Sequence, residues 1–295
     1  MPTARHDNIE IEYEVVGNPE HPALLMVMGF TAQMVTWPDG LMEALAARGL
    51  FVIRFDNRDC GLSSKSEGPA PDTAAMILAL MTKGPAGVTA PYTLSDMALD
   101  AFAVLDDLGI DAAHVVGASM GGMIAQTMAI DNPARVLSLT SIMSTTGSPD
   151  VGQGTPQAME ALISPMPDGR EAILERGLSV SQIISGPLWN KERSEKLVAL
   201  QYDRNFHPIG AAFQMAAILE SGDRTKKLES VTTPTLVIHG REDPLIAPSG
   251  GEATAAAIPA AQLATINEMG HDLPMELWPR LSDLIAGHVN AVPVA

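Results

Sequence analysis

The stretch His114-Val-Val-Gly-Ala-Ser-Met-Gly-Gly122 predicts the fold of this chain. Its apolar start leads into Gly-x-Ser-x-Gly, and a helical pattern follows from Met120 to Ile130. This order predicts a tight strand-to-helix turn that carries Ser119 in a strained backbone conformation. Glycine is expected two positions on either side of the serine, because bulkier residues would clash there. The helix N-terminus would direct amide donors and a partial positive charge at the serine.

Short apolar runs on both sides of this stretch predict further strands of one sheet. Residues 9–16 alternate like a half-buried strand, with Ile9, Ile11, Tyr13 and Val15 on one face. Continuous apolar strands separated by helices indicate an α/β fold, with a mostly parallel sheet and helices on both faces. The continuous runs are 23–28, 51–55, 136–142, 235–238 and 262–266. The other predicted helices are 41–48, 94–108 and 277–288.

The alternation of strands and helices stops between Ser144 and Val231, where proline and glycine are frequent and the apolar pattern is helical. A long insertion after a strand of an open α/β sheet sits above the edge where ligands bind. We therefore predict an α/β core domain from residues 1–145 and 229–295, and a helical cap (lid) from residues 146–228. A peripheral subdomain without a part in ligand binding is the alternative.

The composition describes a folded, acidic chain. Of its 295 residues 46% are hydrophobic, so a large core can be buried, and the net charge is −17. Such a surface repels phosphate backbones and anionic membranes, so we expect neither nucleic-acid nor membrane partners. The single cysteine, Cys60, excludes an intramolecular disulfide, and the first residues lack the apolar region of a signal peptide. We expect a cytoplasmic protein, and the sequence leaves homo-oligomer formation open.

A carboxylate partner for a serine nucleophile is predicted in Gly240-Arg-Glu-Asp-Pro244, directly after the apolar run 235–238. Asp243 would lie on a loop at the edge where parallel strands end, where it could orient a histidine and stabilise its imidazolium form. Glu242 is the neighbouring alternative. Asp150 is another, because it follows the preceding strand.

A histidine base is predicted in Met269-Gly-His-Asp-Leu-Pro274, after the last strand. Of the seven histidines, only His271 combines a late loop, a flanking glycine and a place after Ser119 and Asp243 in the chain. The order serine, aspartate, histidine is the order of a nucleophile-elbow triad. We therefore predict Ser119, Asp243 and His271 as the catalytic residues.

Acyl transfer also needs two hydrogen-bond donors for the developing oxyanion. One is expected to be the backbone amide of Met120, directly after the nucleophile. The other should come from the loop after an early strand, where Met28-Gly29-Phe30 ends an apolar run. Phe30 is the fitting position, so Phe30 and Met120 form the predicted oxyanion hole.

These segments resemble the α/β-hydrolase superfamily over nearly the whole chain, most closely the serine hydrolases related to aclacinomycin methylesterase. The resemblance implies a serine nucleophile, no cofactor, and oxyanion donors at Phe30 and Met120. Many superfamily members carry His-Gly where this chain has Met28-Gly29; that histidine is usually structural, so its absence does not threaten catalysis. The resemblance rests on residues 24–30 (Leu-Leu-Met-Val-Met-Gly-Phe), 52–63 (Val-Ile-Arg-Phe-Asp-Asn-Arg-Asp-Cys-Gly-Leu-Ser) and 114–122, and on the blocks around Asp243 and His271.

The run Asp56-Asn-Arg-Asp-Cys-Gly-Leu-Ser63 contains two carboxylates and an amide that could coordinate a cation. We favour a turn in which Arg58 pairs with nearby carboxylates and carbonyls, and we predict no metal site. A nucleophilic role for Cys60 would need a histidine partner that the sequence does not identify, so Cys60 is expected to be inert.

The cap is rich in methionine and aliphatic residues, which adapt to varied apolar ligands. We predict a substrate pocket that includes Met28, Ile183, Trp189 and Met215; ordinary packing of the cap is the alternative. The cap arginines at positions 170, 176 and 193 are expected at solvated helix positions, so no cation would attract a charged substrate.

The sequence therefore predicts a carboxylic-ester hydrolase that acts on an uncharged, fairly hydrophobic small molecule through an acyl-enzyme. The same triad could instead cleave a lactone or a carbon–carbon bond, or carry out perhydrolysis. A non-enzymatic ligand receptor on the same fold is a third alternative, but a pure binder need not keep all three triad residues. A serine at position 119 argues against epoxide hydrolases and haloalkane dehalogenases, which need a carboxylate nucleophile there.

Overall fold

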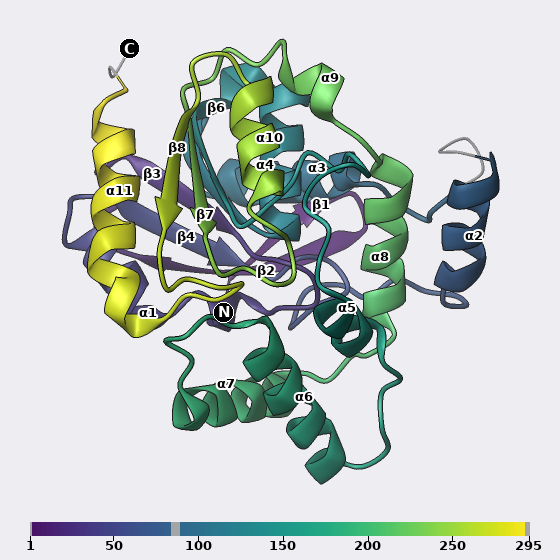
Figure 1. Ribbon diagram of the computed structural model, residues 1–295. Coiled ribbons are helices and arrows are strands. Elements are labelled where there is room, and N and C mark those ends of the chain that lie inside the picture. The colour runs from purple at the N-terminus through teal and green to yellow at the C-terminus, as the bar shows by residue number, and fades with distance from the viewer. Residues whose placement is uncertain (1, 84–88, 293–295) are drawn as a thin grey trace.

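The computed structural model describes residues 2–83 and 89–292 and shows a twisted sheet with helices on both faces (Figure 1). Within these ranges the sheet has eight strands in the order β1-β2-β4-β3-β5-β6-β7-β8. The pairs β1–β2 and β2–β4 are antiparallel, and all other neighbours are parallel. This architecture confirms the predicted fold class. The strands are β1 (Thr3–His6), β2 (Ile9–Val16), β3 (Ala23–Val27), β4 (Phe51–Phe55), β5 (Ala113–Ala118), β6 (Val136–Ile142), β7 (Thr235–Gly240) and β8 (Gln262–Ile266).

Helices cover both faces of the sheet because the central strands are apolar on both sides. In β3, Leu25 and Val27 pack with the α3 and α4 side, whereas Leu24 and Met26 pack with the α1 and α11 side. The helices predicted from the sequence coincide with α1, α3, α4 and α11 within two residues at either end. The helices of the core are α1 (Asp39–Ala46), α2 (Thr73–Lys83), α3 (Leu94–Asp107), α4 (Met120–Asp131), α10 (Ser249–Ala257) and α11 (Trp278–Asn290), with short 3₁₀ turns η1 (Met34–Thr36), η3 (Pro133–Arg135) and η4 (Met275–Leu277).

Two details at the antiparallel edge differ from the prediction. Strand β1 was not predicted, because it is four residues long and buries only Ala4. The predicted half-buried face of β2 is buried at Ile11 and Tyr13 but open at its end, where the side chain of Val15 is 41% exposed. The hydroxyl of the neighbouring Tyr13 donates to Asp107, the last residue of α3.

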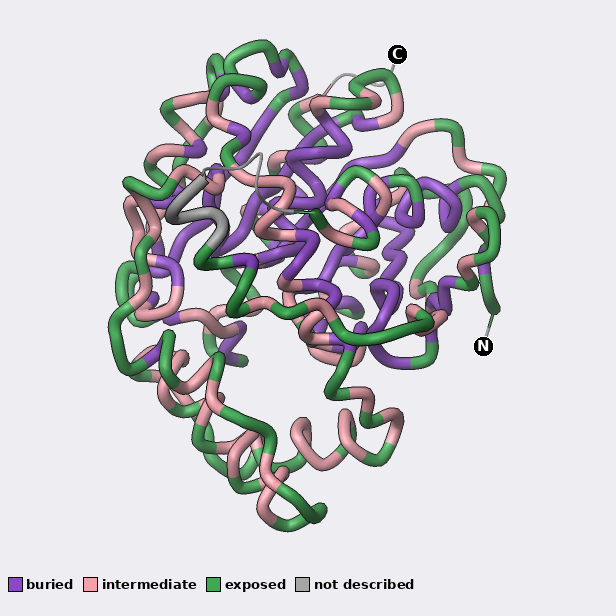
Figure 2. The backbone as a smooth tube through the Cα atoms, turned by 90° about the vertical axis from the view of Figure 1, so that its right-hand side faces the viewer, coloured by how far each residue is buried: buried purple, intermediate pink, exposed green. Residues whose placement is uncertain are grey.

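The segment between β6 and β7 contains helices without strands. Figure 1 shows α6 and α7 beyond the ends of β7 and β8, on the side to which those strands point. Helix α8 joins the body of the molecule, where Phe213 belongs to the main core, whereas α6 and α7 contain no fully buried residue. Figure 2 shows the same contrast between a buried sheet and a partly exposed outer lobe. The helices are α5 (Pro156–Ile163), α6 (Arg170–Ile184), α7 (Lys191–Arg204), α8 (Gly210–Ser221) and α9 (Thr225–Leu228).

None of the helices in residues 2–83 and 89–292 is long and apolar enough to cross a membrane. The apolar run 74–81 lies in α2, and side chains from residue 79 to 88 lie outside the described part of the chain.

Candidate active site

Ser119 lies between β5 and α4 in a backbone conformation that non-glycine residues rarely adopt, with φ 56° and ψ −122°. Two neighbouring groups hold the turn in place. The Ser119 amide donates to the carbonyl oxygen of Ile142 at 2.9 Å, and the Ser144 hydroxyl donates to the Ser119 carbonyl at 2.8 Å. The half-buried serine therefore sits on a strained turn that the adjoining strand β6 supports.

Both glycines of the motif are required by close backbone contacts. A Cβ atom on Gly117 would lie 2.1 Å from the carbonyl oxygen of Gly121. A Cβ atom on Gly121 would lie 2.0 Å from the carbonyl oxygen of Val27. Because the obstructing atoms are backbone, no rotation of a side chain could relieve either clash. Helix α4 can pack this tightly against β3 and β5 only with glycine at these positions.

Asp243 follows β7 and is completely buried. Its Oδ1 atom accepts the amides of Leu245 and Ile246, each at 2.9 Å, and its Oδ2 atom lies 2.8 Å from Nδ1 of His271. Nε2 of His239 is 3.5 Å from Oδ2. Burial alone would raise the pKa of Asp243, but the charge of His271 and these hydrogen bonds outweigh it and hold the pKa well below its ordinary value. At neutral pH the carboxylate is therefore ionised where it faces the imidazole.

The two alternative acids lie elsewhere. Glu242 and Asp150 are both exposed, and the described structure places Asp243 on the imidazole Nδ1. The loops that carry Asp243 and His271 pack against each other, because the Glu242 amide donates to the carbonyl oxygen of Met269 at 3.0 Å. His271 projects from this second loop with its side chain 8% exposed.

The loop after β3 passes directly beside the serine. A Cβ atom on Gly29 would lie 3.0 Å from Cβ and 3.6 Å from Oγ of Ser119. Phe30 is the next residue and packs against the core. Met120 is the first residue of α4, so its amide belongs to the helical turn that lacks intrahelical acceptors. The two predicted oxyanion donors thus belong to the two segments that border Ser119.

A buried glutamine that the sequence analysis missed holds the loop after Phe30. Gln214 of α8 accepts the amide of Thr31 at 2.8 Å through Oε1, and its Nε2 donates to the carbonyl oxygen of Arg58 at 2.8 Å. Thr31 has a positive φ of 57°. The one signal in the sequence is a lone polar residue inside the apolar helical run 211–219, which alone does not reveal a partner 183 positions away.

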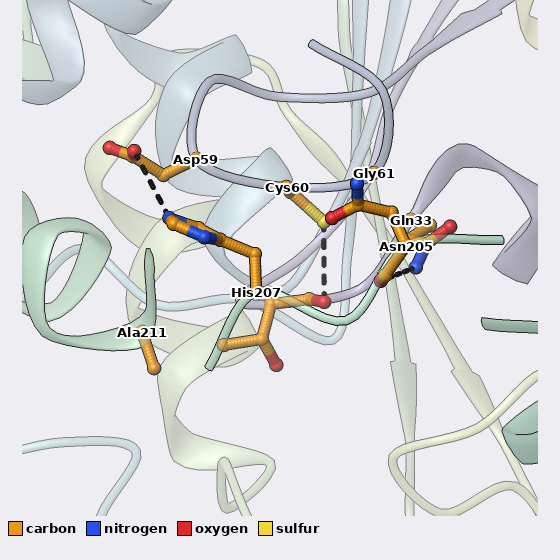
Figure 3. Close-up of a pocket in the computed structure, with 8 residues that line it drawn as sticks. Gln33, Asp59, Cys60, Gly61, Asn205, His207 and Ala211 are labelled. Carbon is orange, nitrogen blue, oxygen red and sulfur yellow. Dashed lines mark hydrogen bonds and ion pairs between the residues drawn. The ribbon is translucent and has the colours of Figure 1, made fainter. Parts of the chain in front are cut away.

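The end of α7 is tied to the same loop through a polar cluster. Arg204 donates to Asp56 at 2.6 Å and to Gln33 at 2.9 Å, and Gln33 donates to the carbonyl oxygen of Asn205 at 2.8 Å. A small cavity of about 40 Å³ lies beside this cluster. Figure 3 shows Gln33 next to Asn205 and the His207 ring pointing toward Asp59 in the turn after β4. Its lining residues are Thr31, Gln33, Asp59, Cys60, Gly61, Asn205, His207 and Ala211.

The turn after β4 agrees with the interpretation that Arg58 is a structural cation. Its guanidinium donates to Asp100 at 2.7 Å, and the carboxylate of Asp59 accepts the Tyr92 hydroxyl at 2.7 Å. Burial raises the pKa of the Cys60 thiol far above its ordinary value, which disfavours the reactive thiolate. Among the described residues no group of three or more potential ligands has the arrangement of a metal site.

The predicted pocket residues come from four segments of the chain: the loop after β3, α6, the turn after α6 and α8. Ile183 lines a cavity of about 220 Å³ between α5 and α6. Met28 is buried below the serine loop, Met215 is half-buried on α8, and the Trp189 indole donates to the Ser181 hydroxyl at 3.2 Å. A single pocket formed by these four side chains stays a prediction.

The expectation that all three cap arginines are solvated is wrong for two of them. Arg170 is exposed and pairs with an exposed aspartate. Arg176, however, donates to the carbonyl oxygen of Ser164 at 2.9 Å, and Arg193 donates to that of Leu273 at 3.0 Å. Burial lowers the pKa of both guanidinium groups. The helical pattern could not show this, because the periodicity of a helix does not record what packs on it: Arg176 is covered by the end of the preceding helix, and Arg193 by a loop 80 positions away.

A family model described as the alpha/beta hydrolase fold matches residues 22–276. The chain belongs to this family. Rhodomycin D methylesterase DnrP of Streptomyces peucetius is 32% identical over the full length of both chains. These matches confirm the resemblance that the sequence motifs indicated. They also show that the chain is a hydrolase.

Solved structures agree with this assignment. The enol-lactonase of Burkholderia xenovorans LB400 has the same fold, with a TM-score of 0.74 at 22% identity over 98% of this chain and 100% of its own. Est816, described as an N-acyl homoserine lactone degrading enzyme, is 25% identical, with a TM-score of 0.72 over 97% of this chain and 99% of its own.

Proposed function

We propose that this hydrolase cleaves a carboxylic ester of an uncharged, fairly hydrophobic small molecule through an acyl-enzyme on Ser119. The observation that carries the proposal is the 2.8 Å contact between Nδ1 of His271 and the buried, charged Asp243. A carboxylate in this position makes Nδ1 the protonated nitrogen, which leaves Nε2 free to accept a proton. The strained turn of Ser119 supports the assignment of this residue as the nucleophile.

In the proposed reaction the Ser119 oxygen attacks the ester carbonyl carbon, and His271 takes the hydroxyl proton. The amides of Met120 and Phe30 donate to the negative oxygen of the tetrahedral intermediate. His271 then passes its proton to the departing alcohol as the acyl-enzyme forms. A water molecule attacks the acyl carbon in the same way, which releases the carboxylic acid and restores the serine.

The relative at 32% identity is named as a methylesterase of rhodomycin D, which supports an ester as the bond cleaved. A lactone is the second candidate, because a lactone-degrading enzyme is 25% identical over nearly the whole chain. A lactone is a cyclic ester, so the same steps apply, except that the alcohol stays attached to the acyl group. Kinetics with open-chain esters and lactones of matched size would rank the two candidates.

The neutral character of the substrate rests on the cap. The cavity that Ile183 lines includes the apolar Val180 and Ala161 beside several polar side chains, among them Glu160, whose carboxylate would repel a second one. Arg176 also lines this cavity, but its Nη2 atom donates to backbone carbonyls at the end of α5 and its Nε atom donates to the Ser164 hydroxyl. A carboxylate buried there without a partner would cost several kcal/mol. A series of neutral and carboxylate-bearing esters tests this point, and a clear preference for the charged set would contradict it.

The variant Ser119→Ala tests the nucleophile. It should lose ester turnover by several orders of magnitude and should not form a covalent adduct with a fluorophosphonate, because no activated hydroxyl is left. The exposed serine variant Ser230→Ala is a matched control that should keep both properties. An adduct on the Ser119→Ala protein, detected by intact-mass spectrometry, would show that another residue is the nucleophile.

A further inference from the structure

The loop that carries His271 is joined to the core by backbone carbonyl oxygens at its two ends and by the His271 imidazole, which faces Asp243. At its start the carbonyl oxygen of Met269 accepts the Glu242 amide at 3.0 Å, and at its end that of Leu273 accepts the Trp278 indole at 3.0 Å. The stretch between these points contacts the cap. There the amide of His271 itself donates to the carbonyl oxygen of Ile184, the last residue of α6, at 2.8 Å.

Two glycines allow this contact between backbones. A Cβ atom on Gly186 would lie 2.5 Å from the amide nitrogen of Gly270, and one on Gly270 would lie 2.1 Å from the amide nitrogen of Gly186. Any side chain on either residue would therefore push the turn after α6 away from the histidine loop. The approach is nearly as close as that of the two glycines in the serine turn, where the corresponding distances are 2.1 and 2.0 Å.

Asp272 bridges the two sides of this contact. Its Oδ1 atom accepts the amide of Gly186, on the cap, at 3.3 Å and the amide of Gly270, on the histidine loop, at 3.1 Å. Burial raises the pKa of Asp272, while these hydrogen bonds and one from the Ser185 side chain oppose that rise. Burial thus disfavours the charged form of this carboxylate. Its Oδ1 atom nevertheless joins the turn after α6 to the histidine loop.

A second cap residue reinforces the same junction. Arg193 of α7 donates to the carbonyl oxygen of Leu273 at 3.0 Å, and its guanidinium lies 4.6 Å over the ring of Trp278. The cap therefore contacts the histidine loop on both sides of Asp272.

We propose that Asp272 is a positioning residue, which joins the cap turn Ile184–Gly186 to the loop of His271 and so sets the imidazole relative to Ser119. This inference rests on the proposed function. Proton transfer tolerates little error in geometry, and a displacement of about 1 Å can cost about 100-fold in rate. The cap would then influence the rate of the chemical step as well as the choice of substrate.

Two variants, Asp272→Asn and Asp272→Ala, test whether the hydrogen-bond acceptor of Asp272 is what matters. Asparagine keeps an oxygen that can accept both amides, so kcat should stay within about threefold of the wild type. Alanine removes the acceptor, so kcat should fall by about 10- to 100-fold while KM changes by less than about threefold. Glu252→Gln, an exposed charge change on α10, is the control and should change neither. Equal activity of the two Asp272 variants, or a loss confined to KM, would overturn the proposal.

An NMR measurement gives a second readout of the imidazole position, and this readout does not depend on turnover. The proton between Nδ1 of His271 and Asp243 should give a far-downfield NMR resonance in the wild type. Gly186→Ala and Asp272→Ala should shift or broaden it, whereas Asp272→Asn and the control Gly287→Ala, whose Cβ meets open space, should not. An unchanged resonance in both test variants refutes the positioning role. The expected changes without any ester turnover by the wild type would instead refute the proposed function and leave the positioning role standing.

Discussion

The substitution Asp243→Asn tests the proposed triad through a feature specific to this structure. Oδ1 of Asp243 accepts two backbone amides, those of Leu245 and Ile246, each at 2.9 Å. An asparagine must keep its oxygen at this position, because its NH₂ group cannot accept either amide. The NH₂ group is then forced to the Oδ2 position, where it faces Nδ1 of His271.

This arrangement reverses the imidazole tautomer. Nδ1 of His271 must now accept a hydrogen bond, so the proton moves to Nε2, and the ring can no longer take the proton of Ser119. The loss of a correctly oriented base in such a triad is about 10⁴-fold in kcat, which corresponds to about 5 kcal/mol of transition-state stabilisation. The overall fold should persist, since asparagine is nearly isosteric with aspartate and both backbone amides keep their acceptor.

The assay is the kcat of a neutral p-nitrophenyl ester, together with the rate of fluorophosphonate labelling at Ser119. Both rates should fall together in Asp243→Asn, because both depend on the same base. The controls Glu242→Gln and Asp150→Asn alter exposed carboxylates and should stay within about twofold of the wild type. Activity of Asp243→Asn within tenfold of the wild type would refute the reasoning, and a collapse in Asp150→Asn would move the acid to that residue.

Three further outcomes follow from the structure. Gly121→Ala places a Cβ 2.0 Å from the Val27 carbonyl oxygen and should cost about 3 kcal/mol or more in urea unfolding, whereas Gly287→Ala should be nearly neutral. Burial lowers the pKa of His114 to about 4, below the value of about 6.5 in the unfolded chain, so the unfolded state binds the extra proton and about 3 kcal/mol of stability is lost as the pH falls from 7 to 4. His114→Asn should flatten this dependence, and an equal slope in the variant contradicts the assignment. Trp189→Ala should shift the preferred ester chain length but leave turnover of a small activated acetate within about tenfold, and a parallel loss on all esters would exclude a pocket role.

The sequence was informative wherever interactions between residues close in the chain decide the structure. The alternation of apolar runs predicted the central strands, because strands covered on both faces must be apolar along their length. The place of Asp243 and His271 after two neighbouring strands was sufficient to expect them together, since parallel strands end at one edge of the sheet. The short edge strand β1 and the exposed Val15 departed from the pattern, where few neighbours constrain the chain, and the core helices α2 and α10 were not predicted.

The sequence by itself thus determined the α/β sheet, the glycine-flanked turn of Ser119, and the loops on which Asp243 and His271 lie. Tertiary structure alone decided that Gln214 holds the loop after Phe30, and that the turn at Gly186 and the carboxylate of Asp272 support the histidine. The physical reason is that periodicity and backbone sterics act over a few residues. The docking of the inserted helices depends on many weak contacts between segments about 80 to 180 positions apart, which no local pattern records.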